Sequence, residues 1–113
     1  MTVLSTLIRA RALISPQADW CQIHVRDEDG RRCALGAIMD AGGSTIAALA
    51  ALRTALRAMN HQECLAIYND THTHSEVLAL FDRAIAIERM KELAAKAPNS
   101  LPAWFVPKVT ETV

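Results

Sequence analysis

The hydrophobic positions along the chain predict helices in three segments. Apolar residues recur at steps of three and four over residues 3–15, 44–59 and 74–97, which is the spacing of amphipathic helices. Pro16 and Pro98 follow the first and the last of these segments, where a proline cannot continue a helix. The pattern therefore predicts a mainly α-helical protein.

Hydroxyl side chains mark the starts of the second and third segments. Ser44 suits the N-cap of the second helix, and Thr73 with Glu76 forms the spacing of a capping box for the last. In the second helix we expect one stripe of larger apolar residues to face the core, namely Ile46, Leu49, Leu52 (or Arg53), Leu56 and Met59.

Between the first two of these segments the chain carries a different pattern. Ile23 and Val25 alternate with polar residues, and the turn residues 27–30 follow, so the pattern allows a short β-hairpin packed on helices. A short helix is expected from Cys33 until the two glycines at 42–43. Gly36 inside that helix predicts the close approach of another backbone segment.

These elements predict one domain. We expect residues 1–97 to form a small bundle of about four helices, with the hairpin between the first two. Residues 98–113 hold three of the four prolines and form a tail rather than a regular element. The tail also carries Trp104 and Phe105, and two adjacent exposed aromatics would be unusual, so we expect the tail to dock on the domain.

Composition narrows the class of protein. The chain has 113 residues, 51% of them apolar, with a formal net charge of zero, which does not resemble the basic footprint of a nucleic-acid binder. No stretch approaches the roughly 18 apolar residues of a membrane span, and the N-terminal residues lack a signal-peptide pattern. Three cysteines without an export signal favour reduced thiols. We expect a cytoplasmic protein.

One polar stretch, residues 61–77, concentrates histidines and could hold zinc. The alternative ligand set is His61, Cys64, His72 and His74, all of types that zinc accepts. The two pairs lie closer together than the knuckles of structural zinc motifs usually do, and the core does not need a metal to fold. We therefore expect no metal and no cofactor.

A second interpretation of the polar residues is catalytic. Cys33 at the start of a helix could have an activated thiol, with His72 or His74 as base and Asn69 or Asp70 orienting it. The competing interpretation makes Cys33 a small buried packing residue. The spacing alone does not decide between these two.

The structural interpretation accounts for most of these side chains without added chemistry. Asn69 and Asp70 look like a helix-breaking pair after an ambiguous segment, residues 61–68, which is either a short helix or a connector. We expect Asn69 to be at least partly buried and to bond backbone groups at helix ends.

The motifs also resemble a known family. Trp20, the Arg26-Asp27 pair with Gly30, the run CALGA from Cys33, and Tyr68-Asn69-Asp70 ahead of Glu76-Val77 occur in this order. This pattern resembles a family of short proteins of bacteria and their phages, catalogued as a domain of unknown function. The resemblance covers about residues 4–87 and implies a phage or mobile-element neighbourhood but no activity.

These observations lead to two hypotheses of function. The first is a small non-enzymatic interaction protein with a protein partner, for which an inhibitor of a host defence complex is one version. Its binding residues would be Trp104, Phe105, Asn69 and Asp70. The alternative is a small cysteine-dependent hydrolase or transferase that uses Cys33 with a nearby histidine.

Overall fold

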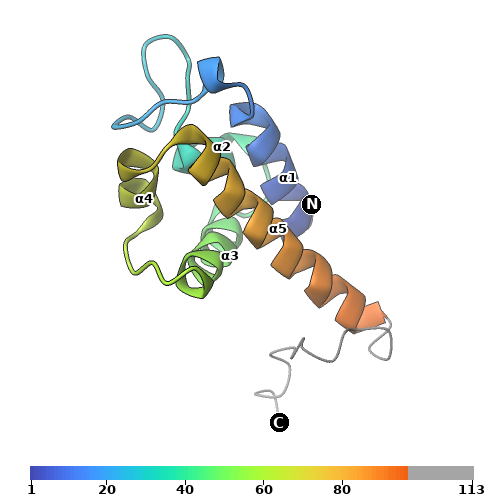
Figure 1. Ribbon diagram of the computed structural model, residues 1–113. Helices are drawn as coiled ribbons and strands as arrows, with labels where there is room; N and C mark the ends of the chain where they lie inside the picture. The colour runs from blue at the N-terminus through green and yellow to red at the C-terminus, as the bar shows by residue number, and fades with distance from the viewer. Residues whose placement is uncertain (97–113) are drawn as a thin grey trace.

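The computed structural model describes residues 1–96, and within them the chain is helical (Figure 1). Five α-helices occur in this part, one more than the sequence predicted, because residues 65–71 form a helix of their own. The helices are α1 (Val3–Ile14), α2 (Ala34–Ala41), α3 (Thr45–Ala58), α4 (Leu65–Thr71) and α5 (His74–Lys96). Trp104 and Phe105 lie outside the described residues, so the docking of the tail stays a prediction.

Side-chain caps set the starts of the long helices as the sequence predicted. The Ser44 hydroxyl accepts a hydrogen bond from the Ala47 amide at 3.1 Å. At the start of α5, the Glu76 amide donates to the Thr73 hydroxyl at 3.2 Å, and the Thr73 amide donates to the Glu76 carboxylate at 2.8 Å. These reciprocal bonds form a capping box, which satisfies amides that have no partner inside the helix.

The core lies between α1, α2, α3 and α5, and α4 covers one side of it. The stripe predicted for α3 was wrong in one part, because Ile46 is 82% exposed. The buried face of α3 consists of Ala48, Ala51, Leu52, Ala55 and Leu56. Small alanine side chains let α3 approach its neighbours closely, and this packing turns the helix so that Ile46 faces solvent.

The long helix α5 packs on the body with only its first half. Its buried residues are Val77, Leu80, Phe81, Ala84 and Ile85. In Figure 1 the C-terminal part of the helix extends beyond the other helices. Phe81 is completely buried and belongs to the largest side chains of the core.

The predicted β-hairpin is absent from the described residues. Residues 20–32 form a loop with two isolated backbone bridges, Trp20 with Arg32 and Arg26 with Arg32. Ile23 has a φ of +76°, which takes it out of the extended region, so the apolar alternation that suggested a strand cannot continue through it. We call residues 20–33 the α1–α2 loop.

Gly36 has the role that its place in a helix predicted. A Cβ atom at this position would lie 2.2 Å from the backbone oxygen of Val25. The Cys33 amide donates to the same oxygen at 3.1 Å. The α1–α2 loop therefore rests directly on the first turn of α2, and any larger residue at position 36 would push it away.

The sequence predicted that Asn69 and Asp70 break a helix, and this prediction was wrong. Both residues lie inside α4. An Asn or Asp side chain disfavours a helix when it bonds its own neighbouring backbone. Here both side chains bond groups outside α4 instead, which leaves the helix intact. The local preference is thus overruled by contacts with the α1–α2 loop.

Candidate functional site

Asn69 is the centre of a buried polar network. Its side chain has 0% exposure. The Oδ1 atom accepts from the Trp20 indole N–H at 2.8 Å and from the Ala34 amide at 3.0 Å. The Nδ2 group donates to the Cys21 carbonyl at 3.1 Å and to the Asp70 carboxylate at 3.2 Å. Two accepted and two donated bonds use the full capacity of an amide side chain.

This network joins α4 to both ends of the α1–α2 loop. Trp20 and Cys21 begin the loop, and Ala34 is the first residue of α2, whose amide has no partner within its helix. Asn69 was predicted to be buried and to bond backbone groups at a helix end, and the structure agrees. These bonds hold α4 against the loop and the start of α2.

Two further side chains fix the middle of the loop. The Asp70 carboxylate accepts from the Ile23 amide at 2.8 Å. The Gln22 amide group donates to the carbonyl oxygens of Asn69 and His72, at 3.1 and 3.0 Å. Those carbonyls belong to the last turn of α4 and to its C-cap residue, where helical partners are missing. The loop therefore caps α4 while α4 holds the loop.

The tip of the loop is a closed turn around Asp27. One carboxylate oxygen accepts from the amides of Asp29 and Arg31, at 3.0 and 2.8 Å, and the other pairs with the Arg31 guanidinium at 2.5 Å. Burial raises the pKa of Asp27, but the hydrogen bonds from Arg31 outweigh this effect, so the pKa lies below the ordinary value. The turn is thus built around an ionised carboxylate.

Asp40 on α2 ties the loop to the helical body through two arginines. Its carboxylate pairs with the Arg26 guanidinium and, at 2.7 Å, with Arg32 Nε. Hydrogen bonds from Arg26, and then from Arg32, lower the pKa of Asp40. The pairs are partly exposed, so each contributes little stability, but together they orient the loop.

Cys21 is a buried structural thiol. Its Sγ donates to the carbonyl oxygens of His24 and Arg31, both at 3.3 Å. Burial is the main reason that the pKa of this thiol is raised, so it stays protonated and can donate. The bonds draw the two sides of the loop together from within.

The loop presents a strained apolar residue to solvent. Ile23 is 75% exposed, and its positive φ is rare for a β-branched residue. Beside it the loop lines an open cleft of about 630 Å³, to which Trp20, Gln22, His24 and Arg26 contribute. Backbone strain of this kind persists only where the surrounding structure determines the conformation, here through the bonds from α4.

In the described part of the chain, Cys33 is not hydrogen-bonded to either histidine of the catalytic interpretation. Cys33 is 5% exposed and is the N-cap of α2, where its Sγ accepts from the Gly36 amide at 3.5 Å. His72 contacts the carbonyl of Tyr68 through Nδ1 at 2.9 Å. Asn69 accepts a hydrogen bond from the amide of Ala34, the residue after Cys33. All four hydrogen-bonding positions of the Asn69 side chain are used, so it has none left to orient a catalytic base.

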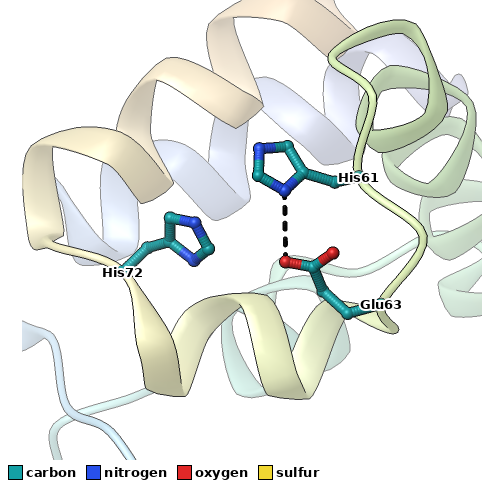
Figure 2. A group of neighbouring side chains, drawn as sticks. All are labelled: His61, Glu63 and His72. Atoms are coloured by element: carbon teal, nitrogen blue, oxygen red, sulfur yellow. Dashed lines mark hydrogen bonds and ion pairs between the residues drawn. The ribbon is translucent and has the colours of Figure 1, made fainter.

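The four residues of the alternative zinc set do not form one group of ligand atoms in the described structure. His74 faces α1, with Nε2 2.7 Å from the Ile14 carbonyl, and Cys64 is exposed. His61 and His72 come together, and the third member of their group is Glu63, which the sequence analysis missed (Figure 2). Carboxylates are common in sequences, so nothing in the sequence alone marks Glu63 as a neighbour of the two histidines. The fold of the segment between α3 and α4 brings it there.

Taken together, the fold and the Asn69 network define a small helical protein with a firmly held loop between its first two helices. The chain belongs to a family of unknown function, DUF6197, whose model matches residues 1–87. This confirms the resemblance that Trp20, the CALGA run and Asn69-Asp70 suggested. No curated protein and no solved structure matches the chain. Among the described helices, none has the length and apolar character needed to cross a membrane.

Proposed function

We propose that the protein is a small non-enzymatic binding protein that covers a surface of a larger protein partner and does so with the α1–α2 loop. The observation that carries the proposal is Ile23, an exposed β-branched residue at positive φ. Such a conformation costs about 1–3 kcal/mol relative to an unstrained residue. A glycine or asparagine would occupy it at a lower cost.

Stability does not explain why an isoleucine stands at this position. Its side chain is 75% exposed and contributes little burial. The Asp70 carboxylate accepts from the Ile23 amide, and the side chain of the preceding residue, Gln22, donates to the Asn69 carbonyl. A rigid apolar side chain that loses little freedom on binding is a favourable anchor for a protein surface. Asn69, completely buried, positions the loop and does not contact a partner itself.

The environment of Cys33 favours a binding role over the enzymatic alternative. A nucleophilic thiol must be reached by its substrate and activated by a base. Cys33 is buried against α2 and caps that helix through its sulfur. This is the environment of a packing residue.

The setting of the proposed interaction rests on the family resemblance and on composition. We propose a cytoplasmic protein of phage or mobile-element type, with inhibition of a host defence complex as one version of its action. Zero net charge gives no support for a nucleic-acid partner. In this proposal Trp104 and Phe105, outside the described residues, are additional contacts to the protein partner.

The test is affinity capture from the native host with mass spectrometry, using three forms of the full chain. Ile23→Asn removes the anchor and relieves the strain. Ile46→Asn is the matched control, because Ile46 is also exposed but lies on α3. We expect the parent and Ile46→Asn to capture the same protein and Ile23→Asn to lose it while remaining folded. Equal capture by Ile23→Asn would contradict the proposal.

A further inference from the structure

A second polar group gathers around Tyr68, from the residues just before α4 and from His72 at its C-terminal end. We propose that His61, Glu63 and His72 form a binding site for one divalent transition-metal ion of the zinc type. One ligand atom from each residue lies within 4.8 Å of the others. Two imidazoles and a carboxylate are a ligand set that zinc and its neighbours accept, with further positions open to water.

The chain brings these residues together across α4. His61 and Glu63 lie in the connector that follows α3, before the helix begins, and His72 is the residue at its end. Figure 2 shows both imidazoles directed toward the Glu63 side chain from the two ends of the short helix. The site therefore forms only when α4 is helical. The positions of the three residues along the sequence do not reveal that they lie close together.

Aromatic packing holds both rings in place. The His72 ring stacks on the Tyr68 ring with centroids 3.8 Å apart, and the His61 ring meets Tyr68 edge-on at 5.0 Å. Tyr68 is almost completely buried and is itself fixed by the core. Ligands whose orientation is set before binding lose little freedom when the ion arrives.

The hydrogen bonds leave nitrogen lone pairs for a metal. His72 Nδ1 lies 2.9 Å from the Tyr68 carbonyl, and because a carbonyl can only accept, this nitrogen carries the proton. His72 Nε2 then keeps its lone pair, which is the usual arrangement of a ligating histidine backed by a carbonyl. His61 Nδ1 lies 3.2 Å from the Glu63 carboxylate, and because a carboxylate only accepts, this nitrogen carries the proton of that bond and Nε2 keeps its lone pair. A metal ion bound between His61 Nδ1 and Glu63 would take the place of this proton.

Only a small contraction separates this arrangement from a bound state. Ligand atoms at about 2.0–2.2 Å from an ion lie roughly 3.5 Å from one another. All three residues are partly exposed, so rotation of their side chains can close the remaining distance. The ion would join both ends of α4, the helix that carries Asn69 and Asp70. This inference is independent of the proposed partner and replaces the expectation of no metal site.

Zinc titration of the full chain, prepared free of metal, tests the site by calorimetry and thermal melting. We expect one zinc per chain and a melting temperature raised by roughly 10 °C at a zinc concentration of about 100 times Kd. Glu63→Gln, which keeps size and fold, and His72→Ala should each weaken binding at least about tenfold. Magnesium should not compete, because it prefers oxygen ligands.

Two matched variants make the result specific. His24→Ala removes an exposed histidine of the α1–α2 loop, and Cys64→Ser removes the exposed thiol next to Glu63. Both should bind zinc like the parent. The proposal is overturned if the parent shows no saturable binding, if Glu63→Gln binds as tightly as the parent, or if Cys64→Ser abolishes binding.

Discussion

The helical body and the α1–α2 loop are held by different forces. In the body, α1, α3 and α5 pack through alanine, leucine and phenylalanine side chains that water does not reach. In the loop, by contrast, Ile23 and Val25 are exposed, and the conformation comes from hydrogen bonds to Asn69 and Asp70 and from those that the loop residue Gln22 donates to α4. The body is thus stabilised by buried area, and the loop by a few polar groups of fixed geometry.

This difference teaches where sequence changes should matter. Apolar packing is distributed over many contacts and depends on volume. A polar network depends on each member, because a buried group that loses its partner keeps the cost of desolvation. Shortening a large apolar side chain should therefore lower the free energy of unfolding most in the body. Removing a single polar atom should have a large effect only beneath the loop.

The largest effect is expected from Phe81→Ala in the body. Phe81 is completely buried between the helices, and its removal leaves a cavity as well as lost burial. We expect the free energy of unfolding to fall by about 3–5 kcal/mol. Urea unfolding followed by circular dichroism measures this. A loss below 1 kcal/mol would mean that α5 does not depend on the core as described.

The next effect is expected from Asn69→Ala beneath the loop. The change removes four hydrogen bonds and leaves the Ala34 amide and the Cys21 carbonyl without their partner. Such a loss costs about 1–3 kcal/mol. His24→Ala, an exposed change in the same loop, should stay within about 0.5 kcal/mol. If both variants unfold at the parent's urea concentration, Asn69 does not hold the loop.

Gly36→Ala sharpens the comparison because the sign of its effect is diagnostic. In an ordinary helix interior this change stabilises by about 1 kcal/mol. Here the new Cβ would lie 2.2 Å from the Val25 oxygen, so the loop must move. We expect a net destabilisation of about 1–2 kcal/mol, since overpacking outweighs propensity. A stabilised variant, measured by thermal melting, would show that the loop does not rest on α2.

The smallest effect concerns the acid side of the pH profile. Arg26 and Arg32 lower the folded-state pKa of Asp40 below its ordinary value of about 3.9. Its contribution to stability is therefore complete above that value and is lost as the pH falls toward the folded pKa. In Asp40→Asn the free energy of unfolding should fall less steeply than in the parent as the pH drops below about 4. The variant should therefore be less stable than the parent above this pH and approach the parent's stability at lower pH. An unchanged limb would show that the ion pairs do not anchor the loop.

The body was largely predictable from the sequence and the loop was not. Helical spacing, Pro16 and the Thr73–Glu76 box mark α1, α3 and α5, because these signals are local. Gly36 predicted a close backbone approach, but not that Val25 makes it. The positive φ of Ile23 arises from distant bonds to α4, and a local alternation pattern cannot reveal it.

The polar sites show the same limit. Asn69 was expected to be buried, yet its helical setting was missed because its partners lie 35 to 49 residues earlier in the chain. The sequence led to an expectation of no metal, and the alternative zinc set joined His61 and His72 with Cys64 and His74 rather than with Glu63. Spacing along the chain predicts ligands that share a knuckle and fails where a short helix such as α4 intervenes.

Asn69 and Asp70 on α4 hold the α1–α2 loop in one conformation through hydrogen bonds rather than through apolar packing. Amide hydrogen exchange of the parent and of Asn69→Ala, resolved by residue, tests this central claim most directly. We predict that the amides of Ile23 and Ala34 exchange much faster in the variant, while buried amides of α3 and α5 change only by the loss of global stability. Equal acceleration throughout the chain, or protected loop amides in the variant, would contradict the account.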